Sequence, residues 1–151
     1  MVIKMKRIFP VILGLGVGLI FTVLFYKQYD AEFVFNEEKI VYVFQQGVYS
    51  SVDAIDKNVG SLNYYVYEKS GDMYYVYAAF TTNEKNKDKL KGYFEDLGYS
   101  MYVKEISLNN TTFLESLEQY DLLMASIDDE SAIGAINASV LGLYEEVYGG
   151  N

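Results

Sequence analysis

An α+β fold is predicted by a strand–helix–strand pattern that occurs twice between Val41 and Ile106. The first copy runs from Tyr42 to Lys69 and the second from Tyr74 to Ile106. Each copy has a β-rich run, a capped amphipathic segment and a second β-rich run. Internal repetition constrains a fold more strongly than any single residue does. Two such units make a four-stranded antiparallel sheet with two helices on one face, which is the ferredoxin-like (βαβ-βαβ) arrangement.

The first copy predicts two strands joined by a short helix. The run Ile40–Phe44 is continuous, apolar and rich in β-branched or aromatic residues, as in a strand, and Gly47 ends or bends it. Ser50 and Asp53 resemble a capping pair at the start of a helix. The helix itself is indicated by apolar residues at helical spacing: Val52, Ile55, Val59 and Leu62. Tyr64–Lys69 predicts the second strand.

The second copy begins with a hairpin. A tight turn at Ser70–Asp72 leads into the strand Met73–Phe80. Thr81 and Glu84 have capping-box spacing, and Gly98 suits the residue that ends a helix. The apolar face of this helix is predicted from Leu90, Phe94 and Leu97. The run Tyr99–Ile106 predicts the last strand of the sheet.

Residues 108–151 predict an acidic helical extension. This segment holds 8 acidic residues and no Lys or Arg. A capping box at Thr112 and Glu115 is expected to begin its first helix. Its second helix is expected to begin at Asp128–Glu130, because the helix dipole favours acidic side chains at the N-terminus. The predicted buried side of the first helix comprises Phe113, Leu117, Tyr120, Met124 and Ile127. That of the second comprises Ile133, Ile136, Val140, Leu143 and Val147.

The N-terminal region predicts a membrane anchor. Residues 8–26 form an uncharged apolar run, close to the about 20 residues that span a bilayer. A cleaved signal peptide would need a shorter apolar core and a small-residue cleavage site, which this region does not offer. Three basic residues lie in residues 1–7, so the positive-inside rule places that tail in the cytoplasm and the C-terminal domain outside. Residues 27–39 would form a short tether.

Composition narrows the class of function. The chain has 12 basic and 21 acidic residues and a net charge of -9, which argues against nucleic-acid binding. It has no Cys and no His, which excludes thiolate metal sites, a cysteine nucleophile and the commonest general base. We therefore expect no catalytic activity, no metal and no cofactor. A weaker alternative is a carboxylate enzyme that uses Glu68 and Glu105, which occupy equivalent positions in the two copies; solvated strand ends explain both residues more simply.

Three short motifs carry a family resemblance over residues 40–107. They are Gln45-Gln-Gly-Val-Tyr49, Tyr74-Tyr-Val-Tyr-Ala-Ala79 leading into Thr81, and Leu97-Gly-Tyr-Ser-Met-Tyr-Val-Lys104. Together with the repeat and the single N-terminal anchor, they resemble the SPOR (sporulation-related repeat) domain, a bacterial peptidoglycan-binding module. The family tends to have Arg where this chain has Tyr75 and Gly where it has Ala79. The resemblance implies peptidoglycan glycan strands as the ligand, typically at the division septum.

One face of the predicted sheet is rich in tyrosine. Side chains alternate between the two faces of a strand, so Phe44 and Val76 share one face and another set of side chains lies on the opposite face. We expect the helices to cover the face with Phe44 and Val76. This candidate glycan-binding set is Gln45, Tyr75, Tyr77, Tyr65, Tyr67, Tyr102 and Lys104. Flat rings stack on sugars, and Gln amides bond to their hydroxyl and acetamide groups. The alternative is that residues 108–151 pack on this face, so that the tyrosines are core.

These observations support two functional interpretations. The first is a single-pass protein of the bacterial cell membrane whose extracytoplasmic SPOR-like module binds peptidoglycan in cell division or envelope remodelling. The second is a protein-interaction subunit of an envelope or division complex that does not bind glycan. Both require a partner outside the membrane, and neither implies catalysis.

Overall fold

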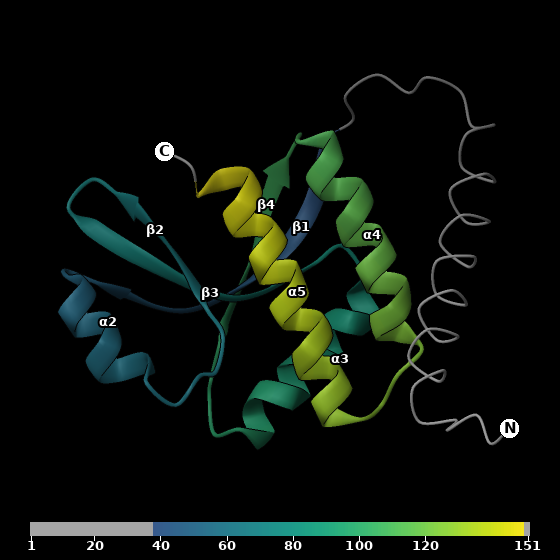
Figure 1. Ribbon diagram of the computed structural model, residues 1–151, viewed down its shortest axis with the longest axis horizontal. Helices are drawn as coiled ribbons and strands as arrows, with labels where there is room; N and C mark the ends of the chain where they lie inside the picture. Colours follow the sequence, from purple (N-terminus) through teal and green to yellow (C-terminus); the bar gives the residue numbers. More distant parts are fainter. Residues whose placement is uncertain (1–37, 150–151) are drawn as a thin grey trace, which may run out of the picture. The chain divides into compact units, whose positions relative to one another are not determined.

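The computed structural model describes residues 38–149 (Figure 1). The predicted cytoplasmic tail, the transmembrane segment and all but the last two residues of the tether lie outside this range. No helix within residues 38–149 is both long enough and apolar enough to cross a membrane. The elements in chain order are β1 (Lys39–Tyr49), α2 (Val52–Val59), β2 (Val66–Ser70), β3 (Met73–Thr81), α3 (Glu84–Asp96), β4 (Tyr102–Leu108), α4 (Thr111–Ala125) and α5 (Glu130–Tyr148).

The four strands form one antiparallel sheet in the order β2-β3-β1-β4. Because every neighbouring pair is antiparallel, β1 runs parallel to β2, with α2 between them in the chain, and β3 runs parallel to β4, with α3 between them. The predicted α+β class and four-stranded antiparallel sheet are confirmed. The turn from β2 to β3 contains Gly71 at a φ of 61°, a left-handed conformation that favours glycine.

Two bulges interrupt the pairing of β1 with β3. Ala78 is an extra residue on β3, and Gln46 is an extra residue on β1. An extra residue on one strand reverses the alternation of the side chains beyond it. Tyr77 and Phe80 therefore face the same side of the sheet although they are three residues apart.

Helices α2 and α3 cover the face that carries Phe44 and Val76, as predicted. The buried residues of both helices join these two side chains in one hydrophobic cluster: Ile55, Val59, Leu90 and Phe94. Leu97 was predicted to extend the apolar side of α3, but it is 49% exposed because it is the C-cap residue of the helix. Gly98 follows it with a φ of 86° and ends the helix as expected.

The N-caps of three helices differ from the predicted ones. The observed caps are Ser51 in place of Ser50 for α2, Asn83 in place of Thr81 for α3, and Asn110 in place of Thr112 for α4. In each case the side-chain oxygen of the observed cap accepts a hydrogen bond from a backbone N–H of the first turn. Thr81 cannot cap α3 because it still belongs to β3, where it pairs with Tyr42.

Helices α4 and α5 cover part of the opposite face of the sheet, and α5 crosses in front of it in Figure 1. Val41, Val43 and Phe80 of the sheet form a second hydrophobic cluster with buried residues of these helices: Phe113, Leu114, Leu117, Val140, Leu141 and Tyr144. The ring of Phe80 stacks on that of Tyr144, with centroids 4.3 Å apart. The C-terminal extension therefore shares a core with the sheet.

The buried sides of α4 and α5 include polar residues that an apolar pattern could not predict. Asp121 and Asn137 are both buried, whereas five predicted residues are only partly buried: Tyr120, Ile127, Ile136, Leu143 and Val147. Asn137 Nδ2 donates a 2.7 Å hydrogen bond to the carbonyl oxygen of Ala78, the bulged residue of β3. A buried carbonyl needs such a partner, so Asn137 satisfies a backbone group at the irregularity in the strand pairing.

Candidate functional site

The predicted tyrosine-rich face is built around one row of residues that crosses all four strands. Gln45 of β1 pairs with Tyr77 of β3 on one side and with Tyr102 of β4 on the other. Tyr77 in turn pairs with Val66 of β2. Directly paired residues point to the same side of a sheet, so the structure brings Gln45, Tyr77 and Tyr102 together on one face.

Lys104 and Tyr75 join this face on either side of the row. Lys104 pairs with Val43, two positions from Gln45, and its Nζ donates a 3.3 Å hydrogen bond to the hydroxyl oxygen of Tyr77. The same ammonium group lies 4.8 Å from the ring centroid of Tyr77 and 5.6 Å from that of Tyr75. Both contacts are within the range of cation–π attraction, so the two rings hold the cation over the sheet.

Tyr77 is core rather than surface. It is 7% exposed, and its ring meets those of Phe80 and Tyr144 edge to face. Burial, with the nearby Glu68 carboxylate as a second cause, raises the pKa of the Tyr77 hydroxyl from 10.0 to about 12. The expectation that Tyr77 offers an open ring to a ligand is therefore wrong, because α5 covers it.

Part of the same face remains open. Tyr102 is 66% exposed, and Gln45, Tyr75 and Lys104 are half-buried. We call these four residues the open patch. It combines two aromatic rings, one amide and one ammonium group, so it can stack on a flat apolar surface and can both donate and accept hydrogen bonds.

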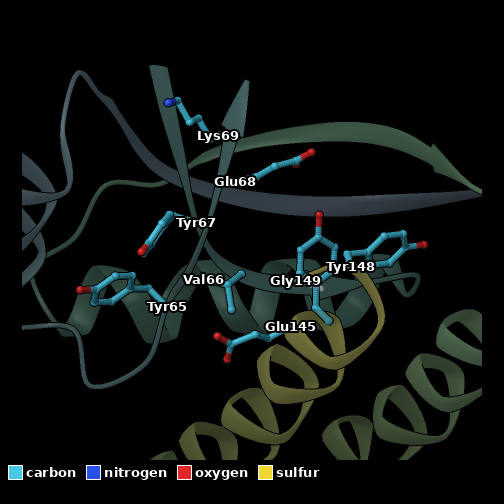
Figure 2. A pocket seen from close by; sticks show the side chains of 9 residues that line it. Tyr65, Val66, Tyr67, Glu68, Lys69, Glu145, Tyr148 and Gly149 are labelled. Atoms are coloured by element: carbon cyan, nitrogen blue, oxygen red, sulfur yellow. The ribbon is translucent and has the colours of Figure 1, made fainter. Parts of the chain in front are cut away.

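Tyr65 and Tyr67 do not belong to this face, contrary to expectation. Val66 and Glu68 occupy it instead, because they pair with Tyr77 and Tyr75. Figure 2 shows the rings of Tyr65 and Tyr67 on one side of β2 and Glu68 on the other. The outer strand is out of phase by one residue with the predicted alignment, and a shift of one residue exchanges the faces of every side chain.

The tyrosines displaced from the candidate face have other contacts. The ring of Tyr67 meets that of Tyr74 edge to face at 5.9 Å on the side of α2 and α3. Tyr65 packs against the cluster that contains α2, and its hydroxyl donates a 3.4 Å hydrogen bond to Asp56. Burial and the Asp56 charge both raise the pKa of Tyr65.

The candidate face carries further residues that the sequence patterns did not predict there. Glu68 and Val48 lie on it, each paired with Tyr75, in addition to Val66 and Phe80 described above. The signal for Val48 was Gly47, since glycine within a strand often marks a bulge. No comparable signal marks Glu68, whose face depends on how β2 aligns with β3.

The carboxylates proposed as a catalytic pair lie far apart. Glu68 is on β2 and Glu105 on β4, which are opposite edges of the sheet. Glu105 pairs with Tyr42, on the face of α2 and α3, whereas Glu68 lies on the other face. Three strand spacings of about 4.8 Å separate β2 from β4. Within the described residues, no group of three or more acidic side chains is placed to hold a metal ion.

A cavity of about 410 Å³ lies beside the candidate face, at the edge of the sheet (Figure 2). Its walls are β2 and the C-terminal end of α5. The lining residues are Tyr65, Val66, Tyr67, Glu68, Lys69, Tyr144, Glu145, Tyr148 and Gly149. None of these belongs to the open patch, so the two features are separate surfaces.

In comparisons with known proteins, no family model, no curated protein and no solved structure matches this chain. Function has to be inferred from the residues themselves. Within residues 38–149, the open patch and the edge cavity each bring polar and aromatic side chains together.

Proposed function

We propose that this chain is a single-pass protein of the bacterial cell membrane with an extracytoplasmic, SPOR-like module that binds peptidoglycan glycan strands. Residues 8–26 would anchor it, and its role would lie in cell division or envelope remodelling. The strand order β2-β3-β1-β4, with α2 and α3 on one face, supports a ferredoxin-like arrangement of the core. The grouping of Gln45, Tyr75, Tyr102 and Lys104 on one uncovered part of the sheet carries the proposal.

The chemistry of the open patch suits a sugar chain. The ring of Tyr102 is exposed and can stack on the apolar face of a pyranose. The Gln45 amide, one strand away, can bond to hydroxyl and acetamide groups. Lys104 supplies a cation for the carboxylates that peptidoglycan glycan carries once its peptides are removed. Among the residues that pair directly with the patch in the described sheet, Glu68 is the acidic one; it pairs with Tyr75 and so lies at the β2 side of the patch.

The covering helices limit the length of glycan that fits. Tyr144 of α5 lies over Tyr77, at the centre of the row across the sheet. A glycan strand could therefore lie only on the β4 side and at the end of the sheet near Tyr75. We expect contacts with a short stretch of sugars and correspondingly modest affinity.

The burial of Tyr77 also favours a second candidate function, a protein-interaction subunit of an envelope or division complex. Helices α4 and α5 occupy the middle of the face on which glycan would otherwise lie. These helices expose apolar side chains such as Leu122, which is 64% exposed, among their acidic residues. In this case α4 and α5, rather than the sheet, would hold the partner.

Binding to cell-wall sacculi separates the two functions. The full chain, in a non-ionic detergent, is incubated with amidase-treated sacculi and pelleted with them. Tyr102→Ala should weaken binding by about tenfold, which corresponds to about 1.4 kcal/mol. Tyr67→Ala is the matched control, because Tyr67 is an exposed strand tyrosine on the opposite face. Absence of binding by the unaltered chain, or equal loss in both variants, would contradict the glycan proposal and favour the interaction subunit.

A further inference from the structure

The cavity beside β2 runs along the open edge of the sheet. Five consecutive residues, Tyr65 to Lys69, line it. Consecutive side chains of a strand point to opposite faces, so a cavity bounded by all five must follow the strand's edge rather than lie on one face. Its other wall is the C-terminal end of α5, which contributes Tyr144, Glu145 and Tyr148, together with the C-cap residue Gly149. Figure 2 shows these two walls from close by. We call this cavity the edge groove.

No strand within residues 38–149 pairs with the outer edge of β2. In the described part of the chain, β2 is the end strand of the sheet and has β3 as its one neighbour. An edge strand presents backbone N–H and C=O groups that another extended chain can bond. Natural proteins block such edges with proline, a bulge, a covering element, a short strand or charged side chains. Of these, β2 has the short length of five residues and the charged side chains Glu68 and Lys69. The stretch Tyr67–Ser70 is exposed and contains no proline, and its pairing with β3 is regular.

The edge groove is electronegative. Glu68 from β2 and Glu145 from α5 contribute carboxylates from the two walls, and neither forms an ion pair among residues 38–149. The C-terminal end of α5 adds the negative pole of the helix dipole. Burial, and then the charge of Glu68, raises the pKa of Tyr144 in the same wall. The one cation in the lining, Lys69, lies over the ring of Tyr74 on the other face of the sheet.

We propose that the edge groove binds an extended peptide segment of a partner protein, which pairs with β2 as a fifth strand and presents Lys or Arg side chains to the carboxylates of Glu68 and Glu145. The open backbone edge selects a peptide, because only a peptide offers N–H and C=O groups at strand spacing. The carboxylates of Glu68 and Glu145, which form no ion pair among residues 38–149, select a basic side chain. The volume of about 410 Å³ is within the usual range of about 300–1,000 Å³ for ligand pockets.

This site is independent of the glycan proposal. Its residues come from β2 with the preceding Tyr65 and from the end of α5 with the following Gly149, whereas the open patch lies on β1, β3 and β4. A partner peptide in the edge groove and a glycan on the open patch could therefore be bound together. Failure of either proposal leaves the other standing.

The test uses two soluble ten-residue probe peptides, one alternating Thr and Lys and one alternating Thr and Glu. Each is titrated against the full chain in non-ionic detergent by fluorescence anisotropy. The Thr/Lys peptide should bind and the Thr/Glu peptide should not. The double variant Glu68→Gln/Glu145→Gln should weaken Thr/Lys binding by roughly tenfold or more. The control Glu115→Gln/Glu130→Gln removes two exposed acids elsewhere on α4 and α5, changes the net charge equally, and should leave binding within about twofold.

Hydrogen exchange of the same complex tests the strand pairing. Bound Thr/Lys peptide should slow the exchange of backbone amides in β2, Val66–Ser70, while amides of β4 at the other edge stay unchanged. If both double variants weaken binding of the Thr/Lys peptide equally, the binding depends on the net charge of the chain and not on the edge groove, which would overturn the proposal. Binding without protection in β2 would overturn strand addition. Absence of binding by the Thr/Lys peptide would overturn the proposal as a whole.

Discussion

The backbone N–H of Thr82, just after β3, donates a 2.8 Å hydrogen bond to Oδ2 of Asp121 in α4. The same carboxylate accepts a 2.7 Å bond from the Thr82 hydroxyl, a bond from the Thr81 hydroxyl and a 3.1 Å bond from Asn86 Nδ2. Asp121 is buried and so are Thr81 and Asn86. One carboxylate thereby ties the C-terminal extension to the end of β3 and to the first turn of α3.

Asp121→Ala should destabilise the fold by about 3–5 kcal/mol, because it leaves several buried donors without an acceptor. The chain has 16 Tyr and no Trp, so tyrosine fluorescence during urea unfolding gives the measurement. Asp128→Ala is the control, since that side chain is 98% exposed and its 3.2 Å ion pair with Lys89 should contribute less than about 1 kcal/mol. Similar costs for the two variants would show that the Asp121 network does not hold α4 in place.

Phe94→Ala should cost about 3–5 kcal/mol, because the ring is 1% exposed and packs 5.8 Å from that of Phe44. Leu97→Ala, three residues further along the same helix, should cost much less because its side chain is half exposed. The free energies of unfolding in urea provide the comparison. A small cost for Phe94→Ala would mean that α3 does not pack on the Phe44 face.

Stability should fall at alkaline pH through buried tyrosines. The hydroxyl of Tyr77 has a pKa of about 12 in the folded chain against 10.0 ordinarily, so the unfolded state loses this proton first. The contribution of Tyr77 is full below about pH 10 and is lost as the pH rises from about 10 to about 12. Tyr77→Phe should therefore reduce the alkaline loss of stability by up to about 3 kcal/mol. Urea unfolding at a series of pH values measures it; an unchanged alkaline loss in Tyr77→Phe would argue that the ring is open to water.

The predicted topology can be checked in cells. A reporter enzyme fused after Asn151 should be active only if it functions outside the cytoplasm, because Lys4, Lys6 and Arg7 precede the apolar run at 8–26. Moving these three cations to the other side of the run should reduce or invert that activity. A reporter that is active in the cytoplasm would overturn the orientation and the cell-wall proposal with it.

Local sequence patterns were sufficient to predict the strands and helices and to predict which face of the sheet α2 and α3 cover. The repeat predicted the four strands and the helices between them. The alternation through Phe44 and Val76 predicted the side that α2 and α3 cover. These features depend on residues close together in the chain, so hydrophobic spacing and turn residues are sufficient to predict them.

The tertiary structure alone decided which tyrosines are exposed. The face of Tyr67 depends on how β2 aligns with β3, where Val66 pairs with Tyr77, and nothing within β2 specifies that alignment. The burial of Tyr77 depends on Tyr144, which is far away in the chain and comes from a helix whose docking site no local pattern encodes. Buried Asn137 is likewise explained by a distant partner, the carbonyl of the bulged Ala78. Periodicity reports which residues share a side, whereas packing and pairing between distant segments determine which sides are covered.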